Sequence, residues 1–205
     1  MAINPLYHKA RYQGSAYTLS QLPPDKGMEV AFAGRSNVGK SSAINAITNI
    51  RGLARTSKTP GRTQMINFFQ LDARRCLVDL PGYGYAKVPE TVKRQWRQTL
   101  SNYLEWRQSL CGIVLVMDIR RLFQPFDLQM LEWCRARGLP VCILLTKSDK
   151  LKRGAAKQAL EKVTAHLQEA FPAARAQLFS AHNRIGVEAI QAQLDRWFEL
   201  DGSPP

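Results

Sequence analysis

The segment MEVAFAGRSNVGKSSAIN, residues 28–45, joins a run of apolar residues to a helix pattern through a loop with two glycines and a lysine. From Gly34 to Ser41 the loop reads G-x-x-x-x-G-K-S, a spacing that binds phosphate when it stands between a strand and a helix. Glycines let the backbone curl so that N–H groups point inward, and the helix N-terminus adds partial positive charge. A structural glycine turn is the alternative, but the complete pattern in this context favours a bound anion.

The residue types in this loop suggest individual roles. Lys40 can reach the β- and γ-phosphates of a nucleotide, and the hydroxyl of Ser41 can coordinate Mg²⁺. We therefore expect the loop and the first helical turn to hold a nucleotide. The expected binding residues are Gly34, Arg35, Ser36, Asn37, Val38, Gly39, Lys40, Ser41 and Ser42.

Strand-like apolar runs alternate with helix patterns along the chain. The runs cover residues 28–34, 64–72, 75–80, 112–118, 141–147 and 176–181, and the helix patterns cover 41–48, 90–106, 126–133, 155–170 and 187–197. This alternation predicts an α/β fold with a doubly wound, mostly parallel six-stranded sheet and helices on both faces. We expect residues 1–27 to be an N-terminal extension, residues 28–198 the domain, and residues 199–205 a flexible tail.

A second polar motif, DLPG, ends the apolar run at 75–80. The carboxylate of Asp79 can hold Mg²⁺ through water, and the amide of Gly82 can meet a γ-phosphate. The motif is weak alone, but ligands of doubly wound sheets bind beyond the carboxyl ends of the strands, where it lies. The residues expected to bind are Asp79, Leu80, Pro81 and Gly82.

Two further motifs, TKSD and SAH, indicate which base is bound. The carboxylate of Asp149 can accept hydrogen bonds from guanine N1–H and the 2-amino group, which adenine lacks, so adenine would leave a desolvated charge unpaired. The stem of Lys147 could cover one face of the base, and backbone N–H groups of SAH could meet guanine O6. The expected residues are Thr146, Lys147, Ser148, Asp149, Phe179, Ser180 and Ala181.

The charge of the chain is strongly basic, with 29 Lys and Arg against 16 Asp and Glu. Such an excess favours a polyanionic partner, RNA before anionic lipid, although a solvated basic face is the plain alternative. The chain has no apolar run of membrane-spanning length and no signal-peptide pattern, so we expect no membrane insertion. The cysteines, at positions 76, 111, 134 and 142, lack metal or disulfide spacing, which favours a reducing cytoplasm.

In their order along residues 28–198, the four motifs resemble the GTPase G domain. The segments GRSNVGKSS, ARTSKTPGRTQ and DLPGYGYAKV together resemble the bacterial EngB family, also called YihA or YsxC, of GTP-binding proteins of ribosome assembly. The resemblance implies slow, Mg²⁺-dependent GTP hydrolysis and a switch role in large (50S) subunit assembly, needed for growth and cell division. It implies a large-subunit precursor as partner, and we expect a monomer.

The resemblance also assigns roles in the loop at residues 55–65. Thr63 would be the switch residue that binds Mg²⁺ and senses the γ-phosphate, with Gly61 and Arg62 beside the nucleotide. Thr59 is the competing candidate, and a polar loop shaped only by its proline and glycine is the plain alternative. We expect this loop to be mobile without the γ-phosphate. The expected metal ligands are Ser41, Thr63 and Asp79.

The residue after Gly82 is Tyr83, where a Ras-type enzyme has the glutamine that orients the attacking water. The intrinsic rate should therefore be low, or the polarising group should come from elsewhere. Related G domains that need potassium carry asparagine at the position of Asn37, so K⁺ held by the Asn37 carbonyl and phosphate oxygens could offset developing charge. Alternatively, Asn37 only shapes the loop. The expected catalytic residues are Asn37, Lys40, Thr63 and Gly82.

Two other function classes stay open. One is a GTP-controlled interaction protein with little catalysis at division sites or the membrane, and the other is an adenine-nucleotide protein, which TKSD disfavours. The histidines, His8, His166 and His182, show no triad or metal spacing, and we expect them at the surface. The aromatic helix with Trp96 and Tyr103 favours core packing over base stacking, although its basic residues could face RNA.

Overall fold

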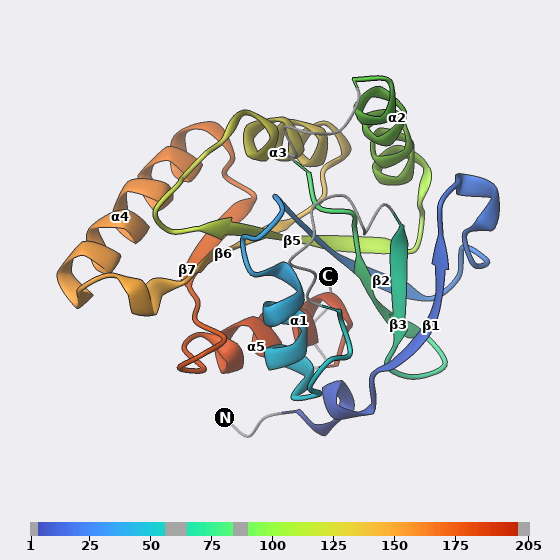
Figure 1. Ribbon diagram of the computed structural model, residues 1–205, viewed down its shortest axis with the longest axis horizontal. Helices are drawn as coiled ribbons and strands as arrows, with labels where there is room; N and C mark the ends of the chain where they lie inside the picture. Colours follow the sequence, from blue (N-terminus) through green and yellow to red (C-terminus); the bar gives the residue numbers. More distant parts are fainter. Residues whose placement is uncertain (1–3, 56–64, 84–89, 201–205) are drawn as a thin grey trace.

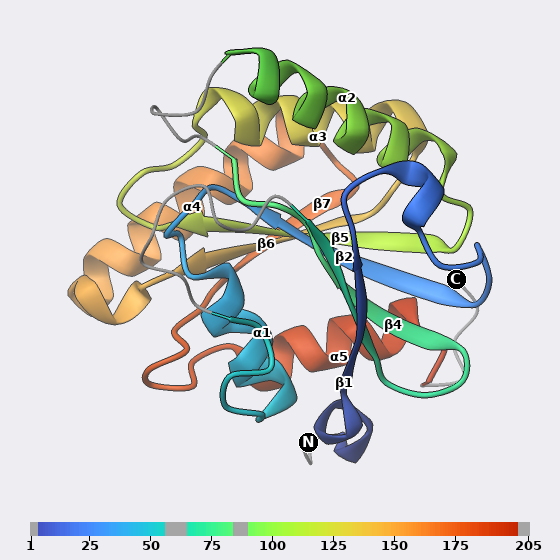
Figure 2. The same ribbon diagram turned by 45° about the vertical axis from the view of Figure 1, so that its right-hand side comes forward.

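The computed structural model describes residues 4–55, 65–83 and 90–200. In these ranges a seven-stranded sheet runs in the order β1-β3-β4-β2-β5-β6-β7, with helices on both of its faces (Figure 1). Helices α1 and α5 cover one face, and α2, α3 and α4 cover the other (Figure 2). The expected α/β fold with a mostly parallel, doubly wound sheet is confirmed.

The elements have the following bounds. The strands are β1 Arg11–Ala16, β2 Met28–Gly34, β3 Ile66–Gln70, β4 Arg75–Asp79, β5 Leu110–Asp118, β6 Val141–Thr146 and β7 Ala174–Leu178. The α-helices are α1 Lys40–Thr48, α2 Glu90–Trp106, α3 Pro125–Arg137, α4 Arg153–Ala170 and α5 Val187–Trp197. Short 3₁₀ helices are η1 Pro5–Lys9, η2 Leu19–Gln21 and η3 Ser148–Lys150.

The expected strand number of six was wrong, because β1 adds a seventh strand. It pairs antiparallel with β3 and places Arg11 opposite Gln70 and Ala16 opposite Ile66. The first three residues of β1 are exposed, and the register shifts between Tyr12 and Gly14. A half-exposed edge strand with an irregular register has no continuous apolar run, so the sequence pattern did not reveal it.

The parallel part of the sheet explains the continuous apolar runs in the sequence. β2 pairs in parallel with β4 and β5, and β6 pairs in parallel with β5 and β7. Both faces of these central strands are covered, and nearly every residue of β2, β5 and β6 is buried. Strands of this kind need apolar side chains on both faces, which removes the alternation of a half-exposed strand.

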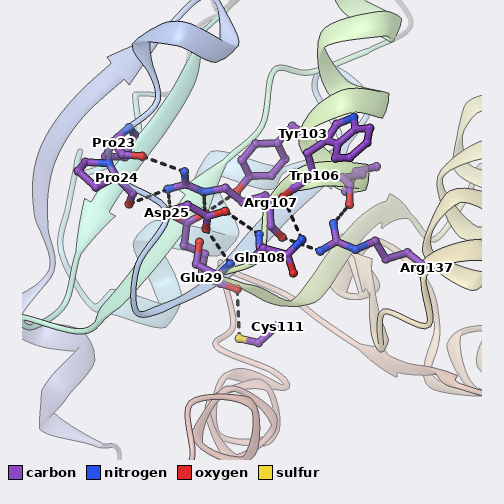
Figure 3. A network of polar contacts seen from close by, with 12 residues as sticks. Pro23, Pro24, Asp25, Glu29, Tyr103, Trp106, Arg107, Gln108, Cys111 and Arg137 are labelled. Carbon is purple, nitrogen blue, oxygen red and sulfur yellow. Dashed lines mark hydrogen bonds and ion pairs between the residues drawn. The ribbon is translucent and has the colours of Figure 1, made fainter.

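A buried ionic network fastens the C-terminal end of α2 to the start of β2 (Figure 3). The guanidinium of Arg107 contacts both carboxylate oxygens of Glu29, with Nη2 2.5 Å from Oε1 and Nε 2.9 Å from Oε2. The hydroxyl of Tyr103 donates to Glu29 Oε2 at 2.8 Å. The side chains of Glu29 and Arg107 are only 4% and 5% exposed. The pair is therefore desolvated, with hydrogen bonds that compensate its burial.

The same network holds the chain that precedes β2. Arg107 donates to the carbonyl of Pro23 at 2.8 Å, and Asp25 accepts from the backbone N–H groups of Gln108 and Ser109 at 2.8 Å each. Arg137, at the end of α3, donates to the carbonyl of Arg107 at 2.8 Å. Segments that are far apart in the sequence thus meet at the end of the sheet opposite the polar motifs.

Side chains outside the site follow the sequence expectations with one exception. Tyr103 is buried in the core as expected, whereas the side chain of Trp96 lies outside the described residues. His8 and His182 are exposed, but His166 is half-buried, 4.5 Å from the ring of Phe123, because α4 packs on the loop before α3. The four cysteines are free thiols. No helix in the described ranges is long and apolar enough to cross a membrane.

Candidate nucleotide site

The four polar motifs gather at the carboxyl edge of the sheet. β2 ends at Gly34, β4 at Asp79 and β6 at Thr146, and β7 ends at Leu178, two residues before Ser180. The last strand is shorter than the apolar run suggested, so SAH lies in the loop beyond it. Because these strands are parallel, their carboxyl ends meet at one edge, where doubly wound sheets bind ligands.

The segment from Gly34 to Ser41 joins β2 to α1 and is called the phosphate loop below. It has the backbone of an anion-binding turn. Asn37 and Gly39 have positive φ values of 63° and 101°, and α1 begins at Lys40 with Gly39 as its N-cap. A Cβ atom on Gly34 would lie 2.6 Å from the carbonyl oxygen of Val116, so only glycine lets β2 pack this closely on β5. The free N–H groups of the first turn of α1 therefore point toward the loop.

The DLPG motif lies directly against this loop. Ser36 N–H donates to the carbonyl of Tyr83 at 2.9 Å, and Tyr83 N–H donates to the carbonyl of Gly34 at 3.4 Å. A Cβ on Gly82 would lie 3.2 Å from Ser36 Oγ, so a side chain at this position would crowd Ser36. Lys40 Nζ and the carboxylate of Asp79 form a buried ion pair. The structure thus brings the expected phosphate ligand and the expected metal ligand together.

The residues at this point fit a magnesium–phosphate group. Ser36 Oγ is buried and has no hydrogen-bond partner among the described residues. Hydroxyl and carboxylate oxygens, as in Ser41 and Asp79, are the donors that Mg²⁺ prefers, with phosphate and water completing its shell. No group of three His, Cys, Asp or Glu within the described ranges could hold a metal.

The TKSD motif is attached to the phosphate loop. Thr146 Oγ1 lies 2.5 Å from the carbonyl oxygen of Val38 and 2.9 Å from that of Met117. Lys147 has a positive φ of 59°, and its ammonium donates to the backbone carbonyl of Asn37 at 2.8 Å. The Lys147 side chain therefore spans the space between the two loops.

The TKSD and SAH motifs are also joined to each other. Ser180 Oγ donates to Asp149 Oδ1 at 2.6 Å, and Ser148 Oγ donates to the carbonyl of Phe179 at 3.0 Å. The hydrogen bond from Ser180, helped by Lys150, holds the pKa of Asp149 below its ordinary value. The carboxylate is therefore ionised at neutral pH and can accept hydrogen bonds from donors on a base.

The structure adds residues that the sequence reasoning missed. Asp118, the last residue of β5, lies 2.9 Å from Lys147 Nζ, and Asp127 of α3 accepts a hydrogen bond from the phenol of Tyr83 at 2.6 Å. The sequence pattern could have indicated Asp118, because it is a carboxylate at the end of a buried apolar run. No local sequence pattern indicated Asp127, since its partner Tyr83 is 44 positions away.

The loop that is expected to contain the switch threonine is not among the residues that the structure describes. Thr63, its competitor Thr59, and the neighbouring Pro60, Gly61 and Arg62 lie outside the described residues. The site described here therefore comprises the phosphate loop, DLPG, TKSD and SAH.

Comparison with known proteins identifies close relatives of the whole chain. Residues 29–147 match the family described as "50S ribosome-binding GTPase". A relative from Nitrosococcus oceani, "Probable GTP-binding protein EngB", is 83% identical over 200 residues, covering 98% of this chain and 100% of the relative. A protein of the same name from Coxiella burnetii is 53% identical over 197 residues, covering 96% of each chain.

Solved structures support the fold at lower sequence identity. The crystal structure of a probable GTP-binding protein engB superposes with a TM-score of 0.67 at 22% identity, over 83% of this chain and 98% of that one. Era in complex with MgGDPNP and a segment of 16S ribosomal RNA superposes with a TM-score of 0.63 at 20% identity, over 84% of this chain and 57% of that one. At this sequence identity, the two similarities are evidence for the fold only.

Proposed function

Because the chain belongs to the EngB family of GTP-binding proteins, within the 50S ribosome-binding GTPases, we propose that it is a GTP-controlled switch in assembly of the large ribosomal subunit. In this proposal it hydrolyses GTP slowly, depends on Mg²⁺ and is needed for normal growth and cell division. The observation that carries the guanine assignment is the contact between Ser180 and Asp149, which holds an ionised carboxylate between the TKSD and SAH motifs.

The residues of the site divide between the two ends of GTP. Backbone N–H groups of residues 34–42 and the ammonium of Lys40 hold the phosphates, while Asp149 accepts from guanine N1–H and the 2-amino group. Ser41, Asp79 and Thr63 would hold Mg²⁺, which neutralises phosphate charge when it is bound. Lys40, which pairs with Asp79 in the structure, would turn to phosphate oxygens when a nucleotide is bound, and Asp79 would then be able to hold Mg²⁺.

The remaining assignments follow the sequence expectations. We expect Gly61 and Arg62 beside the nucleotide, and the Gly82 amide at the γ-phosphate. The domain comprises residues 28–198, with residues 1–27 as an extension that contributes β1 and residues 199–205 as a tail. We place a monomer in the cytoplasm without membrane insertion, in keeping with its four free thiols and its charge of +13.

Slow hydrolysis is supported by the position of Tyr83. Its side chain is 2% exposed and donates to Asp127 of α3, so its hydroxyl is already engaged in a buried hydrogen bond. Charge compensation in the transition state would then come from elsewhere, and we assign it to K⁺ at Asn37. The Asn37 backbone carbonyl already accepts from Lys147, which leaves the exposed side-chain amide oxygen for the ion.

Potassium dependence is tested by single-turnover hydrolysis in KCl and in NaCl at equal ionic strength. We expect faster turnover in KCl for the wild type and no difference between the salts for Asn37→Ala. Equal wild-type rates in the two salts would remove K⁺ from the mechanism and return Asn37 to a role in loop shape.

The buried Tyr83 also favours a second candidate, a GTP-controlled interaction protein with little catalysis that acts at division sites. Both candidates bind guanine nucleotides, so the discriminating measurement is the partner. Large ribosomal subunits should bind more tightly to the GTP-analogue form under the first candidate and show no nucleotide dependence under the second.

The experiment is a titration with fluorescent GDP and a GTP analogue, with and without purified large subunits. Wild type is compared with Asp149→Asn and with the control Asp72→Asn, whose carboxylate pairs with Arg75 outside the site. Loss of guanine binding in Asp149→Asn alone, with subunit binding tighter for the GTP analogue, supports the proposed switch. Unchanged guanine binding in Asp149→Asn would overturn the base assignment.

A further inference from the structure

A buried carboxylate lies beside the candidate base site without belonging to any of the four motifs. Asp118 is the last residue of β5 and is 7% exposed. Its register partner in β6 is Thr146, the first residue of TKSD. The fold thus places Asp118 next to the lysine of that motif, 29 positions further along the chain.

The carboxylate of Asp118 is held in one orientation from its own loop. The backbone N–H of Arg120 donates to Oδ1 at 3.0 Å, its Nε donates to Oδ1 at 2.9 Å, and its Nη2 donates to Oδ2 at 2.7 Å. Oδ2 also faces Lys147 Nζ at 2.9 Å. A carboxylate fixed by several donors in a partly dry position is a preorganised partner for a cation.

Lys147 is held in place by its backbone conformation and by two contacts of its ammonium group. Its backbone has a left-handed φ of 59°, and its ammonium is shared between Asp118 and the carbonyl of Asn37. A free lysine has four rotatable side-chain bonds and loses entropy when it is ordered, whereas this one is ordered before a ligand arrives. Its aliphatic stem is stretched between TKSD and the phosphate loop and forms a preset apolar surface.

We propose that Asp118 is a positioning residue for guanine-nucleotide binding that acts through Lys147. The Asp118 carboxylate holds the ammonium, and the extended stem packs on one face of the base while Asp149 reads its edge. This inference rests on the proposed guanine site and adds a residue that determines affinity without contacting the nucleotide. Asp118 therefore affects how tightly the base is held, and Asp149 determines which base is held.

The test is a double-mutant cycle on fluorescent GDP binding with Asp118→Asn, Lys147→Met and the double variant. Asp118→Asn keeps the side-chain shape and removes the charge, and Lys147→Met keeps an apolar stem. We expect Asp118→Asn to weaken GDP about tenfold, in the range of a lost charge-assisted contact. The double variant should bind within about twofold of Lys147→Met, because coupled residues are not additive.

Two further measurements separate positioning from general support of the fold. Asp72→Asn makes the same substitution at a carboxylate that pairs with Arg75 outside the site, and it should bind GDP within about twofold of wild type. Asp118→Asn should also leave the ratio of GDP to IDP affinity unchanged, because Asp149 reads the 2-amino group that IDP lacks. Thermal unfolding of each variant checks that it is folded.

The outcomes distinguish this inference from the proposed function. A wild type that does not bind GDP overturns the guanine site itself. A wild type that binds GDP, together with an Asp118→Asn loss that adds in full to that of Lys147→Met, or with no loss at all, overturns the positioning role and keeps the guanine site.

Discussion

The phenol of Tyr83 donates a hydrogen bond of 2.6 Å to Asp127 Oδ1, which ties the end of DLPG to the first turn of α3. The tyrosine ring also packs on Phe126, with 4.3 Å between the ring centroids. Asp127 in turn accepts from the backbone N–H of Gln124 at 2.9 Å, as the third helical residue of a capping box in which Gln124 is the N-cap of α3. Tyr83 thus serves to fix the backbone beside the phosphates.

We expect Tyr83→Phe to alter stability more than chemistry. Burial raises the pKa of Asp127, and the hydrogen bond from Tyr83 works against that rise, so its loss leaves the carboxyl group less satisfied. The free energy of unfolding should fall by about 1.5–3 kcal/mol, the cost of a buried hydrogen bond to a charged group. Single-turnover GTP hydrolysis should stay within about twofold of wild type, since only backbone placement changes. A rate loss well beyond this, with unchanged stability, would place the phenol in the chemistry.

We expect removal of the buried Glu29–Arg107 ion pair to lower the stability of the fold strongly (Figure 3). Glu29→Gln removes the buried counter-charge of the Arg107 guanidinium and leaves only the partly exposed carboxylate of Asp25 at 3.6 Å, so the free energy of unfolding should fall by about 3–5 kcal/mol. The control is Lys157→Ala, which removes an exposed pair with Glu161 and should cost less than about 0.5 kcal/mol. Urea unfolding measures both variants. Similar small losses in the two would show that the buried pair contributes no more than a surface one.

Two glycines should respond in opposite directions to alanine. At Gly112 in β5 a Cβ would lie 2.7 Å from the ring of Trp197, so Gly112→Ala should destabilise by about 1–3 kcal/mol through overpacking. At Gly154 in α4 no heavy atom lies within 4 Å of the added Cβ, and alanine should stabilise by about 0.5–1 kcal/mol. Thermal unfolding of both variants checks the signs. A stabilising Gly112→Ala would mean that α5 can shift away from the sheet without loss.

Stability should depend on pH through Asp118. Burial acts to raise the pKa of Asp118, but hydrogen bonds from Arg120 and Lys147 outweigh it and hold the pKa well below its ordinary value. The unfolded chain therefore binds this proton more readily, at a pKa of about 3.9. The contribution is complete above that value and is lost as pH falls toward the folded pKa. Urea unfolding from about pH 5 to about pH 2 should show a shallower decline for Asp118→Asn than for wild type. Parallel curves would contradict this account.

The sequence by itself determined the architecture and the place of the site. Strands buried on both faces must be apolar along their whole length, so β2, β5 and β6 stood out as continuous runs. The motif from Gly34 to Ser41 needs a strand before it and a helix after it, and both are local properties. Parallel strands then bring the ends of the runs to one edge, so the sequence pattern alone predicts that DLPG and TKSD lie near the phosphate loop.

Only the tertiary structure decided which distant side chains meet. β1 became a strand because β3 offered an open edge, although the apolar pattern of Arg11–Ala16 is too weak to show it. The contacts of Tyr83 with Asp127, Arg107 with Glu29 and Lys147 with Asp118 join residues 44, 78 and 29 positions apart. The choice of a partner for a buried charge depends on the relative placement of whole helices and strands, and local sequence patterns do not contain that placement.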